Sequence, residues 1–448
     1  MSYDAVIIGG GPAGEHCAAR LADGGARVAI VERQLVAGEC SYWACIPSKT
    51  LLRSGEALAA ARQVDGAAEA VCGPIEVERA LAYRDYMVSG YSDAGQVKWL
   101  DDSGIELFRG DGRIAGPGRV AVNGDELVTD HIVLATGSEP VLPPVPGLAD
   151  LPGLWTNREA TAVKQIPKRL LVLGGGPVGV ELAQALRRLG AEAVVIEGMD
   201  RLLAREPRQL GQALGRALER DGVELRLGMH ATRAARDGDD YVLSFADGRQ
   251  LRGDKLLVAT GRRPRVEVGL EALGLDPDRR GIAVDDRLAV AGAEGVWAIG
   301  DCNGVFPLTY VGKYQGRVAA ANILGGQARA SYEAVPRVVF TDPQAAAVGQ
   351  PDGAYTATVS LAEVPRTATY TRDWQQAGFM TLVSDGERLT GAYALGPEAG
   401  EWLQQATLAI RARVPLEVLR DTIQPFPTFS ESFLYALQKL GSRTAVPA

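Results

Sequence analysis

Two stretches of the chain share one order of apolar strand, glycine turn and amphipathic helix. Residues 4–32 read DAVIIGGGPAGEHCAARLADGGARVAIVE, and residues 170–197 read LLVLGGGPVGVELAQALRRLGAEAVVIE. The first strand of each stretch is apolar at nearly every position, which is typical of a strand covered on both faces. Each stretch therefore predicts a parallel β-α-β unit, and the second repeats the first 165 residues later.

The glycines of both turns have the GxGxxG spacing of dinucleotide-binding sites. They are Gly9, Gly11 and Gly14 in the first copy and Gly174, Gly176 and Gly179 in the second. Without side chains, the backbone can turn tightly and approach a pyrophosphate at the N-terminus of the helix. One such run is also compatible with a glycine turn in another α/β domain, but two copies between a strand and a helix predict two bound dinucleotides.

The strand after each helix ends in an acid, Glu32 in the first copy and Glu197 in the second. A carboxylate at this place accepts a hydrogen bond from a free ribose 2′-hydroxyl and repels a 2′-phosphate. The second site is therefore expected to prefer NADH over NADPH, although Arg201 lies near enough in the sequence to weaken that preference.

Three further apolar segments end in glycine turns and are expected to line ligand crevices at the ends of strands. They are LATGSEP at 134–140, VATGRRP at 258–264 and GVWAIGDC at 295–302. Asp301 in the last segment is suited to accept a hydrogen bond from a sugar or ribityl hydroxyl, and a turn-forming aspartate is the alternative. After residue 334, alternating apolar segments and then a helical one predict an α+β domain with an antiparallel sheet.

Composition favours small molecules as partners. The chain has 448 residues, 47 basic against 55 acidic side chains and a pI near 5.2, so we expect it to bind neither nucleic acid nor membranes. Neither a signal peptide nor a membrane-spanning segment is recognisable, which predicts a cytoplasmic protein. The five cysteines and three histidines lack the spacing of a structural zinc site, and no metal is expected.

Residues 38–49, GECSYWACIPSK, place Cys40 and Cys45 five positions apart. In an ideal helix their Cα atoms would lie roughly 8 to 9 Å apart, whereas a disulfide tolerates about 7 Å at most. The pair can close only where the start of the helix is distorted, and Pro47, which has no N–H for the carbonyl of Trp43, favours that distortion. We expect a strained, reducible disulfide and a thiolate stabilised by the helix N-terminus, with two unrelated packed thiols as the alternative.

Over essentially its whole length the sequence resembles the flavoprotein disulfide reductases, the family of dihydrolipoamide dehydrogenase, glutathione reductase and mercuric reductase. The motifs GGGPAG, C-x4-C-IPSK, LATGS, GGGPVGVE, GDC, VFTDPQAAAVG and PFPTFSE occur in the order of that family. The resemblance implies an α/β fold with two Rossmann-like, doubly wound dinucleotide-binding domains and a C-terminal α+β domain that forms a homodimer. The implied boundaries are 1–150 and 271–333 for FAD, 151–270 for the nicotinamide cofactor and 334–448 for dimerisation.

The resemblance also implies roles for single residues. Cys45 is the thiol that accepts electrons from the flavin, Cys40 exchanges with the substrate, and Lys49 pairs with Glu181 beside the flavin. Glu431 belongs to the segment that reaches the cysteines of the second subunit. The other residues implied for the FAD site are Pro12, Ala13, Arg33, Gly112, Thr136, Gly137, Asp301 and Thr309, and those for the nicotinamide site include Val178 and Gly261.

The sequence departs from that family at two places. Phe426 stands where the family has a histidine before Pro-Thr, and losing a positioned general base typically costs roughly 10²- to 10⁴-fold in rate. Residues 41–44 between the cysteines are Ser-Tyr-Trp-Ala, which makes the dithiol pocket more aromatic, either as packing or as a platform for substrate. We expect an NADH-dependent reductase of a small disulfide or another thiol-reactive substrate. One alternative is a reductase whose flavin passes electrons directly to a quinone, dye or metal ion, with the cysteines regulatory or dispensable. The other is a redox-sensing or structural flavoprotein with little turnover.

Overall fold

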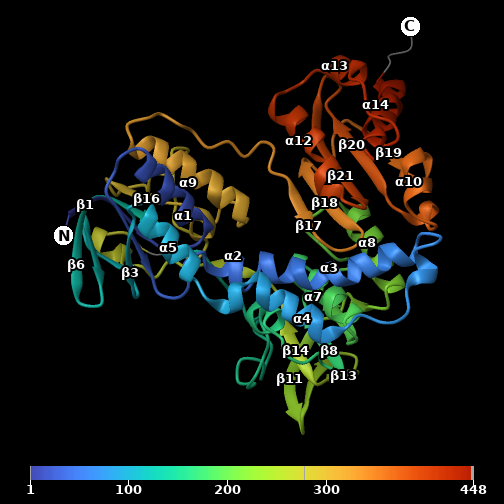
Figure 1. Cartoon of the computed structure of the whole chain (residues 1–448), viewed down its shortest axis with the longest axis horizontal. Coiled ribbons are helices and arrows are strands. Elements are labelled where there is room, and N and C mark those ends of the chain that lie inside the picture. Colours follow the sequence, from blue (N-terminus) through green and yellow to red (C-terminus); the bar gives the residue numbers. More distant parts are fainter. Residues whose placement is uncertain (1, 277, 445–448) are drawn as a thin grey trace. The chain divides into compact units, whose positions relative to one another are not determined.

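The computed structural model describes residues 2–276 and 278–444 (Figure 1). The chain forms two compact units, each assembled from three segments. The first unit comprises the residues up to 47, 83–141 and 261–331, and the second comprises 48–82, 142–260 and the residues from 332 onward. The domain boundaries drawn from the sequence stay a prediction.

A mixed sheet forms the centre of the first unit. Its strands run in the order β3-β2-β1-β6-β5-β4, and β16 pairs with the last residues of β6. The pairs among β1, β2, β3, β6 and β16 are parallel, whereas β5 and β4 extend the sheet as antiparallel strands. The bounds are β1 (Ser2–Ile8), β2 (Val28–Glu32), β3 (Glu106–Arg109), β4 (Arg113–Gly116), β5 (Arg119–Val122), β6 (Asp125–Leu134) and β16 (Val296–Ala298). The pair of β7 (Ser138–Pro140) and β15 (Arg262–Pro264) is antiparallel.

Side chains of β1 alternate between two apolar layers, which explains why this strand is apolar along nearly its whole length. Ala5 and Ile7 belong to a layer that includes residues of helices α1 (Pro12–Asp23) and α9 (Thr309–Ile323). Val6 and Ile8 belong to the layer on the opposite face of the sheet. The strand is therefore covered on both faces, as its composition predicts. The remaining helices of this unit are α2 (Gly38–Tyr42), α5 (Ala94–Asp102) and the short 3-10 turns η2 (Ser89–Tyr91), η3 (Leu270–Leu273) and η4 (Gly300–Asn303).

Helices α1 and α9 pack side by side in the first unit (Figure 1). Glycines of α9 lie at their contact. A Cβ at Gly316 would be 2.8 Å from the carbonyl oxygen of Ala13, and a Cβ at Gly312 would be 3.2 Å from the Ala13 Cβ. Larger residues at these positions would push the helices apart, because protein interiors are closely packed. The first turn of α9, which begins at Thr309, is thus fixed against the first turn of α1.

The second unit contains a parallel sheet with the strand order β10-β9-β8-β14. This order corresponds to β3-β2-β1-β6 of the first unit, and both match the 3-2-1-4 order of Rossmann folds. Helix α7 (Pro177–Arg188) follows β8 as α1 follows β1, 165 residues later. The internal repeat predicted from the sequence is therefore present in three dimensions. The bounds in this part are β8 (Arg169–Leu173), β9 (Glu192–Glu197), β10 (Glu224–Leu227), β14 (Lys255–Val258), the antiparallel β11 (Ala231–Asp237), β12 (Asp240–Phe245) and β13 (Gln250–Gly253), and helices α6 (Asn157–Thr161) and α8 (Arg208–Arg220).

The last part of the second unit is an antiparallel sheet of order β17-β18-β21-β20-β19, with helices packed on it. Met380 and Leu382 of β20 belong to the same apolar core as Trp402, Phe433 and Leu437 of the helices. The sequence prediction of a C-terminal α+β domain is confirmed, and so is the α/β class of the rest. The bounds are β17 (Arg337–Val339), β18 (Gln344–Gly349), β19 (Tyr355–Ser360), β20 (Phe379–Ser384), β21 (Leu389–Gly396), α10 (Pro365–Tyr370), α11 (Ala399–Trp402), α12 (Gln404–Arg411), α13 (Leu416–Asp421) and α14 (Glu431–Thr444). Helices α3 (Cys45–Arg62) and α4 (Val77–Met87) each contain residues of both units.

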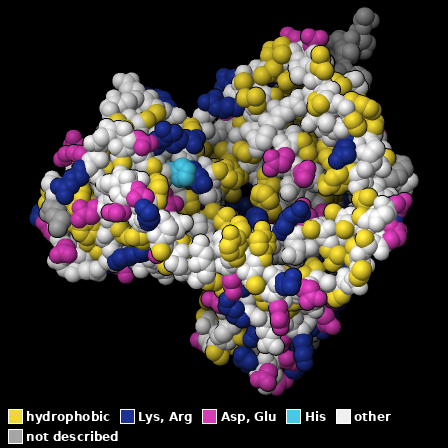
Figure 2. All heavy atoms as spheres, in the orientation of Figure 1, with side chains coloured by type: hydrophobic (Ala, Val, Ile, Leu, Met, Phe, Trp, Pro, Cys, Tyr) yellow, Lys and Arg dark blue, Asp and Glu magenta, His cyan; other side chains and the backbone are white. Residues whose placement is uncertain are grey.

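Basic and acidic side chains are interspersed over the face of the protein shown in Figure 2. The sequence as a whole has 47 basic and 55 acidic residues, so neither sign greatly exceeds the other. Within residues 2–276 and 278–444, no helix combines the length and the apolar character that crossing a membrane requires.

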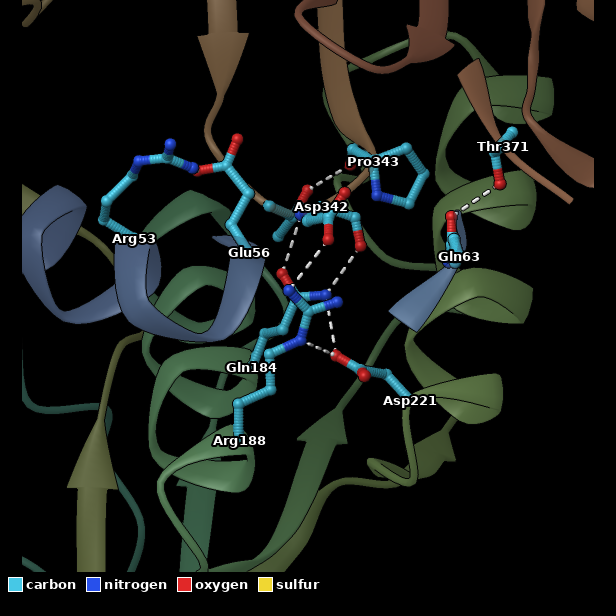
Figure 3. Close-up of polar contacts among 10 residues, drawn as sticks. Arg53, Glu56, Gln63, Gln184, Arg188, Asp221, Asp342, Pro343 and Thr371 are labelled. Atoms are coloured by element: carbon cyan, nitrogen blue, oxygen red, sulfur yellow. Dashed lines mark hydrogen bonds and ion pairs between the residues drawn. The ribbon is translucent and has the colours of Figure 1, made fainter. Parts of the chain in front are cut away.

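Arg188, the last residue of α7, lies in a polar cluster of the second unit (Figure 3). Its Nε donates to Asp221 Oδ2 at 2.6 Å, and its Nη1 donates to Asp342 Oδ2 at 2.8 Å. Gln184, one turn earlier, donates to Asp221 and to the carbonyl of Asp342 and accepts from the Asp342 N–H. Although burial disfavours the charge, the carboxylates of Asp342 and Asp221 raise the pKa of Arg188. The cluster joins α7 to the segment before β18.

Replacing Arg188 by methionine is expected to lower the free energy of unfolding by about 2 to 3 kcal/mol, because two partly buried carboxylates lose their cation. Urea unfolding at pH 7 measures this change. The matched control is Arg252→Met, which removes an exposed ion pair with Asp237 in the same unit and is expected to change stability little. Equal effects of the two substitutions would contradict a special contribution of the cluster.

Candidate functional site

The first glycine turn, between β1 and α1, has the backbone that a pyrophosphate requires. Gly9 has a φ of +111°, and a Cβ there would lie 2.3 Å from the carbonyl oxygen of Ala135. A Cβ at Gly14 would lie 2.0 Å from the Gly9 carbonyl oxygen, whereas no described atom lies within 4 Å of the same position at Gly11. Gly11 caps α1 and has no side chain, so the first N–H groups of the helix stay open to an anion. The turn fits a dinucleotide.

The second glycine turn, between β8 and α7, repeats this geometry. Gly174 has a φ of +114°, and its Cβ would lie 2.5 Å from the carbonyl oxygen of Ala259. The Cβ of a residue at 179 would lie 2.0 Å from the Gly174 carbonyl oxygen. At Gly176, the N-cap of α7, no described atom lies within 4 Å of the position that a Cβ would take. This turn therefore fits a second dinucleotide.

Each acid at the end of the following strand holds its own glycine turn. Glu32 accepts hydrogen bonds from the N–H of Gly10 at 2.8 Å and of Gln34 at 2.7 Å. Glu197 accepts the equivalent bonds from Gly175 at 2.7 Å and from the N–H two residues after it at 2.8 Å. A carboxylate has about four acceptor positions, so both acids keep capacity for a ribose hydroxyl. The sequence did not reveal this structural role.

The residues predicted for the first dinucleotide lie along one edge of the first sheet, where its parallel strands end. Such an edge is the usual place for a ligand in an open α/β sheet. Asp301, on η4 after β16, accepts a hydrogen bond from the Ser138 hydroxyl at 2.6 Å, and Arg262 donates to the same hydroxyl at 2.9 Å. The others are Pro12 and Ala13 after β1, Arg33 after β2, Gly112 after β3, and Thr136 and Gly137 after β6. Gly261 directly precedes β15 in the same unit, and Val178 lies in the first turn of α7 in the second unit.

The helix that would separate Cys40 from Cys45 is interrupted between them. Helix α2 ends at Tyr42, Trp43 leaves the helical conformation with a φ of −135°, and α3 begins at Cys45. Pro47 lies in the first turn of α3, where a missing N–H costs nothing. The distortion expected from the sequence is present, and the structure holds both cysteines as thiols.

The two sulfur atoms meet at the hydroxyl of Thr309. Its Oγ1 lies 3.3 Å from the Sγ of Cys40 and 3.4 Å from the Sγ of Cys45. Thr309 is the first residue of α9, and Cys45 is the first residue of α3. Two helix N-termini, each the positive end of a helix dipole, are therefore present at the dithiol and favour negative charge on sulfur. The sequence placed Thr309 only among the cofactor-binding residues.

The acidity of the Cys40 thiol depends on the second cysteine. A hydrogen bond with Cys45 raises the pKa of the Cys40 thiol well above its usual range, and burial adds to this effect. The Thr309 hydroxyl and the ammonium of Lys313 act in the opposite direction, because both stabilise a thiolate. The balance of these effects favours the protonated form of Cys40.

The aromatic residues between the cysteines have different surroundings. Tyr42 is buried, packs with Val88, and donates a hydrogen bond to Gln96 at 3.2 Å. Trp43 is half-buried and stacks on Tyr91, with ring centroids 6.5 Å apart. Tyr42 thus serves packing, and Trp43 is the aromatic side chain of the spacer that keeps exposed surface.

Lys49 and Glu181 are brought together in the second unit. Lys49 Nζ lies 2.6 Å from Glu181 Oε2 and 4.7 Å from the ring centroid of Phe340. The other oxygen of Glu181 accepts the Phe340 N–H at 2.9 Å. Glu181 is buried, so this pair forms with little competition from water.

Glu431 begins α14 in the second unit and is buried. Its carboxylate accepts the N–H of Thr428 at 3.2 Å and the hydroxyl of Tyr435 at 3.5 Å. Phe426, at the position where the related motif has histidine, is 72% exposed. In the isolated chain, Glu431 therefore stabilises the start of its own helix.

Two charged residues of α9 and α1, Lys313 and Glu15, were not predicted from the sequence. Lys313 lies one turn after Thr309 on α9, and its charge acts on both Cys40 and Glu15. Glu15 lies on α1, and with His16 and Trp99 it lines a cleft of about 390 Å³ between α1 and α5. Burial raises the pKa of the Glu15 carboxyl from about 4.5 to about 7, opposed by Lys313 and assisted by Glu32. No sequence motif contains these residues, because only the packing of α9 on α1 brings them together.

Replacing Glu15 by glutamine is expected to stabilise the protein at pH 8 by about 2 kcal/mol. Between about pH 4.5 and 7 the unfolded chain loses the Glu15 proton while the folded protein keeps it, so the wild type loses stability as the pH rises over this range. Unfolding midpoints at pH 4.5 and 8 measure the difference, which should vanish at the lower pH. Glu294→Gln, at an exposed position of the same unit, is the control. An equal gain in stability in this control, or an equal gain in Glu15→Gln at both pH values, would refute the raised pKa of Glu15.

Among the residues that the structure describes, no group of three or more histidine, cysteine, aspartate and glutamate side chains is arranged to hold a metal ion. The chemistry assembled in the first unit is instead that of a dithiol beside a dinucleotide-binding turn. The second unit carries a separate dinucleotide-binding turn and the Lys49–Glu181 pair. This combination suits transfer of electrons between a nucleotide and a disulfide.

Solved structures similar to this chain include one from Escherichia coli and one from Mycobacterium tuberculosis. The Cu(II) complex of the HOCl-induced flavoprotein disulfide reductase RclA from Escherichia coli has a TM-score of 0.83 and 28% identity, covering 98% of this chain and 99% of that one. LpdA from Mycobacterium tuberculosis has a TM-score of 0.85 and 25% identity, covering 97% and 99%.

Curated relatives and family models lead to the same group. A dihydrolipoyl dehydrogenase from Thermus scotoductus is 36% identical over 454 residues, which cover 98% of this chain and 97% of the relative. A mercuric reductase from Acidithiobacillus ferrooxidans is 35% identical over 451 residues, covering 96% and 81%. Residues 3–316 match the model of the pyridine nucleotide-disulphide oxidoreductases, and residues 335–437 match the dimerisation domain of these proteins. The chain therefore belongs to the pyridine nucleotide-disulphide oxidoreductases, the flavoprotein disulfide reductase family that its motifs resemble.

Proposed function

We propose that this protein is an NADH-dependent, FAD-containing reductase that passes electrons through Cys40 and Cys45 to a small disulfide or another thiol-reactive substrate. The observation that carries the proposal is the meeting of both sulfurs at the Thr309 hydroxyl. Membership of the family supports the coarser reaction, electron transfer between a pyridine nucleotide and a disulfide. We infer a cytoplasmic location, where thiol products stay reduced.

The residues present fit both cofactors. The first glycine turn would hold the FAD pyrophosphate, with Glu32 at a ribose and Asp301 at the ribityl chain. The second turn would hold NADH, with Glu197 at the adenosine ribose and Lys49 paired to Glu181. Bound FAD would supply a carrier that takes a hydride from NADH and delivers electrons to a disulfide.

The two cysteines would act in sequence. The Cys40 sulfur attacks one sulfur of the substrate disulfide, forms a mixed disulfide and releases half of the substrate as a thiol. The Cys45 sulfur then attacks the Cys40 sulfur, which releases the second thiol and re-forms the Cys40–Cys45 disulfide. NADH provides two electrons and one proton, and the solvent provides the second proton, so one disulfide becomes two thiols.

We infer that the protein acts as a homodimer. The dimerisation domain that the family model identifies supports this assembly. Two apolar side chains within that domain, Ile423 and Phe426, are 93% and 72% exposed in the single chain, and a second copy would cover them. In such a dimer the segment that contains Glu431 would approach the dithiol of the other subunit.

A second candidate function is reduction of a soft metal ion at the same thiols. Curated relatives include mercuric reductases, and the RclA structure is a Cu(II) complex. Thiolates bind soft metal ions well, and Cys40 and Cys45 offer two such ligands close together. In this case the metal ion would be the substrate, held by Cys40 and Cys45.

The decisive experiment measures NADH oxidation with small disulfides, quinones and Hg²⁺ or Cu²⁺ for the wild type and for Cys40→Ser. We expect turnover of a disulfide that falls at least about 10²-fold in the variant, because the exchanging sulfur is lost. Cys72→Ser, at an exposed cysteine, is the control and should behave like the wild type. If only metal ions are turned over and their turnover requires Cys40, the second candidate function is favoured. If only quinones are turned over, and their turnover does not require Cys40, both candidate functions are rejected.

The nucleotide preference has its own test at Glu197. Because Glu197 also accepts the Gly175 N–H, glutamine is a better substitution than arginine: it removes the charge and keeps one acceptor oxygen. We expect Glu197→Gln to raise the ratio of kcat/KM for NADPH to that for NADH about tenfold. Glu192→Gln, at the exposed start of the same strand, is the control, and an unchanged ratio in Glu197→Gln would argue against the assignment.

A further inference from the structure

The dithiol needs a proton acceptor when Cys40 reacts, and position 426 offers no histidine. Resting on the proposed function, we propose that the Thr309 hydroxyl transfers the proton of Cys40 to the Cys45 sulfur, so that the Cys45 thiolate is the base of the dithiol. The proton then leaves the attacking sulfur without a residue from outside the first unit. Thr309 is in this view a catalytic residue, because it touches both reacting atoms.

The hydroxyl has the bonding capacity that this transfer requires. A threonine hydroxyl has one hydrogen and two lone pairs, so it can donate to one sulfur while it accepts from the other. Its distances to the two sulfurs, 3.3 and 3.4 Å, are nearly equal. In the structure the hydroxyl donates to the Cys40 sulfur, which is the arrangement after transfer. Rotation of the hydroxyl reverses both hydrogen bonds and gives the arrangement before transfer. An S–H group is a weak donor and sulfur a weak acceptor, so an oxygen between them makes a better route than direct S–H···S contact.

The hydroxyl and the sulfurs are held in place from both sides. Gly312 fixes the first turn of α9 against Ala13 of α1, and Thr309 begins that turn. On the dithiol side, Gly38 has a φ of +60°, and a Cβ there would lie 2.9 Å from the Cα of Gly11. Helix α2, which carries Cys40, is therefore also anchored at the first glycine turn. Such rigid support keeps reacting groups at a productive distance.

The charges at the site fit a proton that starts on Cys40. The hydrogen bond with Cys45 raises the pKa of the Cys40 thiol, which favours a proton on Cys40 before the reaction. The N-termini of α3 and α9 stabilise one negative sulfur at this point. Lys313 stabilises the charge when it moves to Cys40. The transfer therefore moves one negative charge over a short distance between two favourable places.

The chemical step balances without another reagent. The S–H bond of Cys40 breaks, its hydrogen passes to Thr309 Oγ1, and the hydrogen of Thr309 passes to the Cys45 sulfur. The Cys40 sulfur forms a bond to one sulfur of the substrate disulfide, and the other sulfur leaves with the electron pair and takes a proton from the solvent. When Cys45 later attacks Cys40, it returns its proton to the second leaving thiolate.

The test measures how fast iodoacetamide alkylates Cys40 in the holoenzyme reduced with dithiothreitol at pH 7, read by mass spectrometry. We expect Thr309→Val to slow this reaction about tenfold, because the thiol loses its route to a base. Thr309→Ser keeps the hydroxyl and should restore most of the rate. With the disulfide substrate, Thr309→Val should lower kcat roughly 10- to 100-fold.

A double-mutant cycle of Thr309→Val and Cys45→Ala distinguishes a proton relay from a simple hydrogen bond to Cys40. If Thr309 passes the proton to Cys45, then Thr309→Val slows alkylation of Cys40 while Cys45 is present and has no further effect in the Cys45→Ala background. Unchanged alkylation in Thr309→Val would overturn the proposal in favour of direct transfer between the sulfurs. Equal slowing by Thr309→Val with and without Cys45 would overturn it too, because the hydroxyl would then act on Cys40 alone.

The alkylation measurement does not depend on the proposed substrate. If the cycle gives the expected pattern while no disulfide is turned over, the relay stands and the proposed function fails. If a disulfide is turned over and Thr309→Val matches the wild type in both assays, the proposed function stands and the relay fails.

Discussion

Two sulfur atoms that belong to cysteines five positions apart meet at one hydroxyl because the chain leaves the helical conformation between them. An unbroken helix would place the Cα atoms too far apart for a disulfide. The interruption at Trp43 ends α2 and lets Cys45 begin α3, so the cysteine gains the positive end of a helix dipole. Pro47 fits only because it falls in the first turn of the new helix. The redox chemistry proposed here depends on this break.

The first glycine turn connects the cofactor site with the dithiol. Gly11, which leaves space for a pyrophosphate, is also the residue against which Gly38 packs at the start of α2. Ala13, two residues later, is the contact for Gly312 of α9, the helix that provides Thr309. A dinucleotide bound at this turn would therefore adjoin the same backbone that positions the sulfurs and the hydroxyl. The repeated turn in the second unit has the glycines but no cysteine pair after it, so the proposed redox chemistry belongs to the first copy.

Local patterns in the sequence were sufficient to predict the repeat, the glycine turns, the acids at the strand ends and the distortion near Pro47. These features depend on residues within about 30 positions of one another. The position of Thr309 between the sulfurs depends on a contact across 264 residues or more, and that of Glu15 beside Lys313 depends on how α1 and α9 pack. The hydrogen bonds of Glu32 and Glu197 to their own turns could not be predicted either, because ribose binding alone already accounts for a glutamate at these positions. The buried cluster around Arg188 has no motif at all.

The central claim is that Cys40 and Cys45 store electrons in addition to those held by the flavin. An anaerobic titration of the oxidised holoenzyme with NADH, followed by absorbance and by counting of accessible thiols, tests it most directly. The account predicts that full reduction takes two equivalents of NADH per subunit, that two new thiols appear with the first, and that a long-wavelength thiolate-to-flavin band accompanies them. Full bleaching of the flavin by a single equivalent, with no change in the number of thiols, would contradict it.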